Sequence, residues 1–466
     1  MIWEVQGSGA ASPVVGQSHV VEGVVVGDFQ GAGQLGGYFL QEEDAEADGD
    51  PATSDGIFIF DTGLDVSVEE VVRVQGTVTE FFGLTEINNV SQAAVCSTGT
   101  IVTEATVTLP VASIDVWETV EGMLITIPHT LYVSGNFTQG RFGEVDLSVR
   151  GPLDSPTNVV APGAPALALQ DLNDRSRIQL DDGSTVQNPL PLPPYLGPDG
   201  TLRTGDTIPS LTGVLGFGFG VYEVHPIEPV EFTRANPRPQ SPPEVGGSLT
   251  VGAYNVLNYF TTLDGSGPIC GPLGNQDCRG ADNAFEFERQ RAKLVAALAE
   301  LDADIVGFME IENHPADVPT ADLVGGINDV LGAGTYDYIP TGAIGSDAIR
   351  VALIYKPAEV TPVGDFAILD SAVDPDFDDQ KNRPALAQTF RENGTDDGVT
   401  VAVNHLKSKG SDCNDVGDPD TGDGQGNCNG TRNRAAQALV DWLGTDPTGS
   451  GSAESLITGD LNSYGR

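Results

Sequence analysis

Residues 398–410, GVTVAVNHLKSKG, and residues 454–464, ESLITGDLNSY, decide the fold that we predict for the second half of this chain. Each begins as a run of apolar and β-branched residues, which favours a buried strand, and each ends in polar side chains. Three further strand-like runs lie at 248–258, 304–313 and 350–357, and two helical patterns lie at 285–302 and 432–444. Strands that alternate with helices predict an α/β domain over residues 248–466.

The helical pattern at 285–302 is the clearest of the helices. Its apolar residues recur on one face, and either of two polar residues before it can cap its first amide groups. The apolar residues are Phe287, Leu294, Leu298 and Leu301, and the candidate caps are Asp282 and Asn283.

Polar side chains follow four of the predicted strands where each strand ends. They are Asn255, Asn258, Glu310, Asn404, His405, Asp460 and Asn462. A buried strand holds its last side chain firmly, so strand ends that converge can position metal ligands and acid–base groups. One such residue alone is more typical of a loop start or a cap. Four strands that end in this way indicate a shared site.

The charge balance argues against a nucleic-acid partner unless basic groups gather locally. The chain has 67 acidic and 22 basic residues and a formal net charge of −45, and all of its lysines lie in the second half. Such a surface repels a polyanion unless local cations or metal ions intervene. Most of these carboxylates are typical of a solvated surface in a secreted or high-salt protein. No long apolar run and no signal peptide are visible, and we read both ends as possible fragment boundaries.

Four of the five cysteines form two close pairs, Cys270 with Cys278 and Cys413 with Cys428. We interpret them as two disulfide-closed loops, which persist in an oxidising compartment. A zinc site is the alternative, although neither pair has the short spacing of a metal knuckle. The remaining Cys96 is expected to be a buried thiol.

The motifs DIVGFMEIEN, NHLKSKG and TGDLNSY, in this order after YNVLN, resemble those of the endonuclease/exonuclease/phosphatase superfamily, whose domain is a deoxyribonuclease-I-like four-layered sandwich. Within it, the Gly- and Asp-rich segment 411–439 resembles the bacterial secreted nuclease family. The resemblance spans about residues 249–466. It implies a metal-dependent hydrolase that uses Mg²⁺ or Mn²⁺.

The resemblance also implies roles for individual residues. Glu310 would ligate the metal with Asn255 beside it, Asp460 would orient or deprotonate the attacking water, and Asn462 would bind a non-bridging oxygen. His405 would contact the phosphate and help to protonate the leaving group. Arg383 would bind phosphate, and Asp347 would orient His405. Surface ion pairing is the alternative for Arg383.

The sequence departs from the superfamily after TGDLNSY. The family pattern continues to an Asp and then to an Asp-His pair, and the sequence ends at Arg466. We therefore expect a C-terminally truncated domain that is incomplete in its last layer and hydrolyses little. Robust Mg²⁺-dependent plasmid nicking that is lost in His405→Ala would contradict this expectation.

Two clusters near His405 have competing interpretations. The loop 412–429 carries Asp412, Asp415, Asp418, Asp420 and Asp423, which could bind Ca²⁺ or simply form a solvated acidic loop. The flanking cations Lys407, Lys409, Arg432 and Arg434 could form a basic strip that grips a phosphate backbone, or be scattered surface charge.

Before residue 248 the period of two in the apolar pattern predicts β-rich modules. Residues 1–110 resemble the small oligonucleotide-binding-type barrels that precede the catalytic domain in bacterial secreted nucleases, with a scaffolding role favoured over strand binding. Residues 111–232 form a second β-rich module, and the Pro-rich stretch 233–247 is the predicted linker.

Together these features predict a multidomain, extracellular nuclease that cuts DNA or RNA by metal-assisted water attack. A lipid or inositol phosphodiesterase or phosphatase of the same superfamily is one alternative. The other is a surface-binding β-module protein with an inert catalytic domain. Membrane insertion is not expected, and the sequence makes no prediction of oligomeric state.

Overall fold

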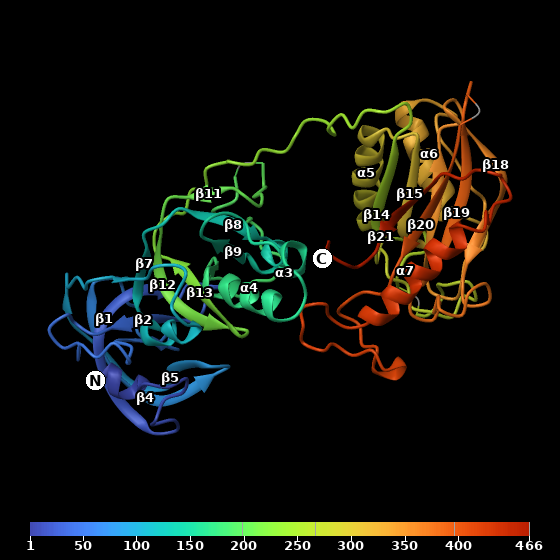
Figure 1. Cartoon of the computed structure of the whole chain (residues 1–466). Helices are drawn as coiled ribbons and strands as arrows, with labels where there is room; N and C mark the ends of the chain where they lie inside the picture. The colour runs from blue at the N-terminus through green and yellow to red at the C-terminus, as the bar shows by residue number, and fades with distance from the viewer. Residues whose placement is uncertain (198, 266, 396, 466) are drawn as a thin grey trace. The chain divides into compact units, whose positions relative to one another are not determined.

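The computed structural model describes residues 1–197, 199–265, 267–395 and 397–465. Its contacts divide the chain into two units (Figure 1). Unit 1 consists of Met1–Pro156 and Leu167–Arg238, and unit 2 of Thr157–Ala166 and Pro239–Arg466. No helix in the described ranges is long and apolar enough to cross a bilayer.

A closed barrel with the strand order β1-β2-β3-β5-β4 forms the first part of unit 1. Its strands are β1 (Ser18–Phe29), β2 (Gly37–Gln41), β3 (Gly56–Ile59), β4 (Glu70–Phe81) and β5 (Leu84–Thr98), preceded by α1 (Ile2–Gln6). Alternate residues of the strands fill the interior, where Val21, Tyr38 and Val74 are buried. The structure thus contains a small barrel, and its identity as an oligonucleotide-binding barrel stays a prediction.

Cys96 corrects one expectation, because it is exposed rather than buried. It lies in the second half of β5, where most residues face solvent. Its Sγ lies 3.5 Å from the Glu22 carboxylate. The β-like pattern around Cys96 did not reveal that this end of β5 lacks a covering layer.

An eight-stranded sheet with the order β11-β8-β9-β10-β13-β12-β7-β6 completes unit 1. Its strands are β6 (Ala105–Thr106), β7 (Leu124–Ile127), β8 (Leu131–Gly135), β9 (Val145–Ser148), β10 (Arg177–Leu180), β11 (Thr207–Ile208), β12 (Leu211–Gly218) and β13 (Val221–Pro226). The helices of unit 1 are the 3-10 helices η1 (Ile114–Val116) and η2 (Glu118–Val120), α2 (Gln139–Phe142) and most of α4 (Ala164–Arg175). The short α3 (Pro156–Val159) and the first turn of α4 fall in the segment Thr157–Ala166, apart from Pro156, and so belong to unit 2. Its core includes Trp117, Ile125 and Leu215.

Unit 2 contains two four-stranded sheets, β14-β15-β17-β16 and β18-β19-β20-β21. The strands are β14 (Val251–Tyr259), β15 (Ile305–Glu312), β16 (Asp337–Tyr338), β17 (Ile349–Tyr355), β18 (Val360–Leu369), β19 (Arg383–Glu392), β20 (Gly398–His405) and β21 (Ser455–Asp460). The helices are α5 (Ala284–Leu301), α6 (Val318–Leu331), η3 (Asn414–Val416) and α7 (Asn429–Leu443). The predicted mixed α/β fold is confirmed.

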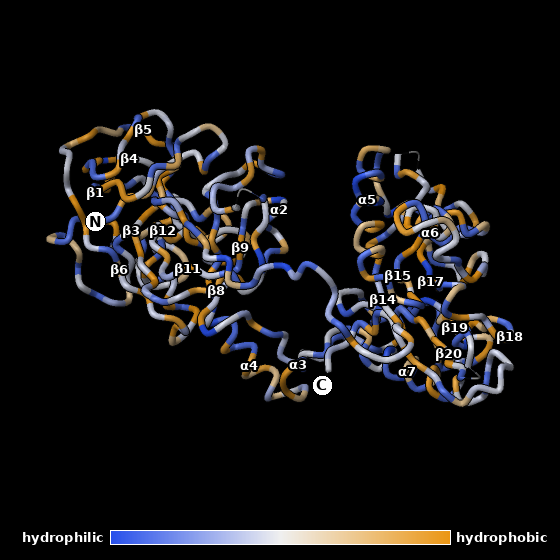
Figure 2. Tube along the Cα trace, turned by 90° about the horizontal axis from the view of Figure 1, so that it is seen from above, coloured by the Kyte–Doolittle hydropathy of each residue, from blue (hydrophilic) through white to orange (hydrophobic). Residues whose placement is uncertain are grey.

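The cores of unit 2 define four layers. One core joins the first sheet to α5 and α6, a second lies between the sheets, and a third joins the second sheet to α7. Strands β15 and β20, one from each sheet, are mostly apolar and buried, and Figure 2 colours the chain by hydropathy. Gly307 allows the sheets to approach, since a Cβ there would lie 2.4 Å from a Val403 methyl group.

Candidate active site

Strand pairing in the second sheet places His405 beside Asp460. The parallel strands β20 and β21 pair so that His405 lies opposite Asp460. Gly459 precedes Asp460 with φ of 124°, and a Cβ there would lie 2.1 Å from the main-chain oxygen of Asn404. Only glycine permits this approach, so the TGD motif fixes the position of the carboxylate.

Irregularities in the first sheet turn Asn255 and Glu310 toward the same place. The register of β14 with β15 shifts after Asn255, and that of β15 with β17 shifts after Phe308. Glu310 has φ of 64° and Leu257 has φ of 50°. Bulges and positive φ angles redirect side chains and are costly, so their clustering here is typical of a functional site.

The predicted catalytic residues converge. Asn255 Nδ2 donates to Glu310 Oε1 at 3.0 Å and lies 3.5 Å from Asp460 Oδ2. His405 Nε2 is 3.9 Å from both of these carboxylates. Asn462 is held beside them, because its main-chain N–H donates to Asp460 Oδ1 at 2.9 Å and its Nδ2 donates to the Leu406 carbonyl at 2.9 Å.

The surroundings of His405 favour its neutral form. Burial and the Arg383 guanidinium lower the pKa of His405, and the carboxylates of Asp460 and Glu310 oppose this shift. Its Nδ1 is buried without a hydrogen-bond partner among the described residues. The imidazole faces the carboxylate pair through Nε2.

Cations lie on the other side of His405. Arg383 is the strand partner of His405, and its Nε lies 3.0 Å from Asp347 Oδ2. Arg279 Nη2 lies 2.8 Å from Asp347 Oδ1. Burial and the neighbouring charges of Arg383 and Lys381 lower the pKa of Lys407. Like charges held together in this way provide a site for an anion.

The predicted role of Asp347 is corrected by this geometry. Its carboxylate oxygens pair with Arg279 and Arg383, and the described residues show no hydrogen bond from His405 to Asp347. Asp347 therefore positions the two arginines rather than the imidazole.

The carboxylate side of the site fits a hard divalent cation. Neither Glu310 nor Asp460 forms an ion pair with a lysine or arginine in the described ranges. Oxygen ligands from one or two carboxylates, with water in the remaining positions, are what Mg²⁺ accepts. No three His, Cys, Asp or Glu side chains of the described residues are grouped for a metal, so the amide of Asn255 and water would complete the shell.

The loop 412–429 uses its carboxylates locally. Asp418 accepts hydrogen bonds from the main chain of Gly430 and Thr431 at 3.1 and 2.6 Å, and Asp415 pairs with Lys381 at 2.6 Å. Asp412, Asp420 and Asp423 each accept from a main-chain N–H two residues later. Ca²⁺ binding by this loop stays a prediction.

The predicted basic strip is only partly assembled. Arg432 is buried and donates to the main-chain oxygens of Lys407, Gln425 and Asn427, so it braces the loop and is not free for phosphate. Lys409 lies over the ring of Tyr464, with Nζ 3.9 Å from its centroid. Arg434 is exposed. Lys407 is the member that joins the cations around Arg383.

Both predicted disulfides are present, Cys270–Cys278 and Cys413–Cys428. The second closes a loop between β20 and α7 across 15 positions. Replacing Cys413 and Cys428 together with serine should destabilise unit 2 by about 3 kcal/mol, because the unfolded chain regains loop entropy. Urea unfolding checks this, with the signal of Trp442 taken as the difference in fluorescence between chains with and without Trp442→Phe, because Trp3 and Trp117 also fluoresce. An unchanged midpoint would contradict the prediction.

A basic groove beside the site was not predicted. It encloses about 470 Å³ between α5 and the turn at Leu257 and Asn258. Its cations are Arg279, Arg289 and Lys293, all exposed. Arg289 and Lys293 have no carboxylate within ion-pair distance in the described part of unit 2. Arg289 and Lys293 are four residues apart on the predicted helix 285–302, so the sequence alone could have placed both cations on one helix face.

Comparisons with known proteins give the following similarities. Residues 88–235 match a domain of unknown function (DUF8508). No curated protein sequence is significantly similar to the chain. Solved structures with some similarity to the chain, at low identity, include proteins of the endonuclease/exonuclease/phosphatase family.

Three of these structures illustrate the range. An endonuclease/exonuclease/phosphatase family protein from Bacteroides thetaiotaomicron is 15% identical over 46% of this chain and 63% of its own, with a TM-score of 0.28. A mannosyl-6-phosphatase from the same species is 16% identical over 46% and 65%, with a TM-score of 0.28. The human Nocturnin catalytic domain is 16% identical over 39% and 59%, with a TM-score of 0.26. The chain spans less than two thirds of each.

Proposed function

We propose that unit 2 is a secreted, Mg²⁺- or Mn²⁺-dependent phosphodiesterase that cleaves nucleic acid by direct attack of water. The observation that carries this proposal is the position of His405. Its Nε2 lies 3.9 Å from the carboxylates of Glu310 and Asp460, and on the neighbouring strand β19 the residue opposite it is Arg383. A phosphodiester needs both kinds of charge, because negative charge accumulates on its oxygens during attack.

The residues divide the work by position. When bound, the cation would neutralise developing negative charge on the phosphoryl oxygens and be held by Glu310 and Asn255. Asp460 would accept the proton of the attacking water. Neutral His405 suits a hydrogen bond from Nε2–H to the phosphate or the leaving oxygen.

Further contacts would hold the substrate. Arg383 and Lys407 would bind the remaining phosphate oxygens, since Arg383 presents a planar fork and Lys407 a nearby point charge. The amide of Asn462 would contact a non-bridging oxygen. No covalent intermediate is involved.

The test combines cation binding with hydrolysis, using the full chain. We expect calorimetric titration with Mn²⁺ and with Mg²⁺ to show binding in unit 2. Whatever hydrolysis of bis(p-nitrophenyl) phosphate and of single-stranded DNA the chain shows, even if weak, should stop in EDTA. Cation binding is the first readout, because it needs only the metal ligands, whereas hydrolysis in the superfamily also needs acid–base residues beyond those described for this site. Absence of both binding and cation-dependent hydrolysis would refute the proposal.

The basic groove favours nucleic acid over a small phosphoester. Arg279, Arg289 and Lys293 extend positive charge away from His405, which a polyanion can use and a lipid or inositol phosphate head group cannot fill. The disulfides support an extracellular location, because they persist under oxidising conditions.

Charge reversal in the groove tests this substrate class. Arg289→Glu and Lys293→Glu should each weaken DNA binding by about tenfold at low salt and flatten its salt dependence, because each removes a phosphate contact. Hydrolysis of bis(p-nitrophenyl) phosphate should not change. Arg391→Glu, on the exposed end of β19, is the matched control. Equal losses in all three variants would point to net charge alone.

A further inference from the structure

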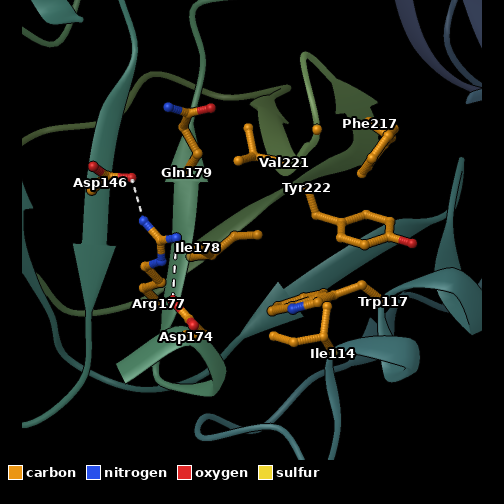
Figure 3. Close-up of a pocket in the computed structure, with 11 residues that line it drawn as sticks. Ile114, Trp117, Asp146, Asp174, Arg177, Ile178, Gln179, Phe217, Val221 and Tyr222 are labelled. Carbon is orange, nitrogen blue, oxygen red and sulfur yellow. Dashed lines mark ion pairs between the residues drawn. The ribbon is translucent and has the colours of Figure 1, made fainter. Parts of the chain in front are cut away.

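Unit 1 contains a pocket with one apolar wall and one polar wall. It encloses about 420 Å³ beside η1, β10, β12 and β13, which is within the range of small-ligand sites (Figure 3). The apolar wall consists of Ile114, Trp117, Phe217, Val221 and Tyr222. The polar wall consists of Asp146, Asp174, Arg177 and Gln179. The pocket lies inside the region matched by the domain of unknown function.

The aromatic wall is fixed in place. The ring of Tyr222 lies 4.8 Å from that of Phe217 and 6.3 Å from that of Trp117, centroid to centroid. The Tyr222 hydroxyl donates to Glu118 Oε2 at 2.7 Å. Trp117 is only 2% exposed and forms the floor, while Phe217 and Tyr222 remain partly exposed. A ligand would meet these two rings without rearranging the core.

The polar wall retains hydrogen-bonding capacity. Arg177 is 42% exposed and is shared loosely between Asp174 at 3.3 Å and Asp146 at 3.9 Å. Gln179 Oε1 is buried and lacks a hydrogen-bond partner among the described residues, and Gln179 Nε2 makes only a long contact of 3.4 Å with Glu144. A buried amide oxygen without a partner is costly, so a turn of the Gln179 amide that let a ligand hydroxyl reach this oxygen would be stabilising.

A second hollow continues from the polar wall. It encloses about 240 Å³ and shares Asp146, Asp174 and Arg177 with the first. The other polar residues around it are Ser134, Asp154, Ser155, Gln170 and Asn173. The Asp146–Arg177–Asp174 group therefore separates two adjoining compartments, one lined partly by aromatic rings and one almost wholly polar.

The lining excludes one ligand class and favours another. Three carboxylates, Asp146, Asp154 and Asp174, face a single cation, Arg177, so a phosphate backbone would be repelled. A neutral sugar has an apolar C–H face that packs on an aromatic ring and hydroxyl groups that donate to carboxylates and accept from Arg. Both walls match these surfaces.

We propose that this pocket binds a neutral oligosaccharide. One sugar ring packs against Phe217 and Tyr222, with its hydroxyls on Gln179 and Arg177, and the next ring enters the polar compartment. Unit 1 would then attach the protein to a glycan surface. This inference does not depend on the function proposed for unit 2.

The test is binding of neutral hexasaccharides to the full chain, using cellohexaose, maltohexaose, laminarihexaose and chitohexaose in separate calorimetric titrations. We expect one of them to bind with a dissociation constant below about 1 mM, a weak but specific affinity. Arg177→Met should weaken it by about tenfold because it removes donors to the sugar hydroxyls. Asp174→Asn should weaken it by a similar factor because it replaces a charged hydroxyl acceptor with a neutral one and loosens Arg177, which pairs with Asp174 at 3.3 Å. Arg150→Met, at an exposed arginine of unit 1, should not.

Three results would overturn the proposal. One is no binding of any hexasaccharide up to 10 mM, taken as about tenfold above the expected constant. Another is binding that neither variant weakens, which would place the sugar elsewhere. The third is that dT₁₂, and no sugar, binds the wild-type chain and is weakened by Arg177→Met, which would assign the pocket to a polynucleotide. Because Asp174→Asn changes no volume, it keeps the test valid if Arg177→Met fails to fold.

Discussion

Glu310→Gln is expected to weaken Mn²⁺ and Mg²⁺ binding to unit 2 by about 100-fold or more, since mutation of merely supporting residues around a metal costs 10- to 100-fold. Glu310 is the only carboxylate of the site that hydrogen-bonds to Asn255 within 3.0 Å in the described structure, and it lies on the bulged part of β15. Glutamine keeps the shape of the side chain and removes its charge. Calorimetric titration of the variant with each cation measures the loss, and cation-dependent hydrolysis should fall with it.

Glu454→Gln is the matched control for this prediction. It makes the same chemical change in the residue that precedes β21, at an exposed position of unit 2. Thermal unfolding in EDTA should be the same for both variants and the wild-type chain. If Glu310→Gln binds Mn²⁺ as the wild-type chain does, Glu310 is not a ligand and the assignment of the metal site is wrong.

The convergence of His405, Asp460 and Glu310 was accessible from sequence because His405 and Asp460 end apolar strands and Glu310 lies near the end of one. His405 and Asp460 come from neighbouring strands of one sheet and Glu310 from a strand of the other. Gly459 fixes the backbone just before Asp460, because no larger residue fits there. The cap of α5 was also readable, since Asn283 accepts a hydrogen bond from the Glu286 main chain at 3.1 Å. These features depend on residues close together in the sequence, so sequence patterns can predict them.

Long-range packing was not readable. α6 has Pro319 in its first turn and two glycines in its interior, which hide a helix whose Leu323 and Ile327 are fully buried. Arg432 was interpreted as a phosphate ligand because charge alone says nothing about the carbonyl oxygens that surround it. The pocket of unit 1 draws on residues between 114 and 222, so no local pattern contains it.

Unit 1 is expected to lose stability as the pH rises, because it buries carboxyl groups. Glu121 is fully buried, and burial, aided by the nearby charge of Glu118, raises its pKa to about 8. Burial likewise raises the pKa of Glu42 to about 7. A group whose pKa is raised in the folded state binds its proton more tightly there than in the unfolded chain. Its contribution is complete below the unfolded pKa, near 4.5, and is lost as the pH rises through the folded value.

Glu121 should therefore account for about 3–5 kcal/mol of stability that disappears between pH 4.5 and pH 8, at about 1.4 kcal/mol per pKa unit. In Glu121→Gln this loss should vanish. One side-chain oxygen can still accept from the Thr85 main chain, as Glu121 Oε1 does at 3.0 Å, and no proton needs to be lost. The variant should match the wild-type chain near pH 4.5 and exceed it in stability near pH 8.5.

Urea unfolding at several pH values measures this difference. In a Trp442→Phe background the remaining tryptophans, Trp3 and Trp117, both lie in unit 1, so their fluorescence reports that unit alone. Glu228→Gln removes a carboxylate at an exposed position and should leave the pH dependence of the wild-type chain unchanged. A free energy of unfolding that rises with pH, or an equal pH dependence in Glu121→Gln and the wild-type chain, would show that Glu121 is ionised in the folded protein. The charge would then need a partner that the buried Oε2 of Glu121 lacks among the described residues.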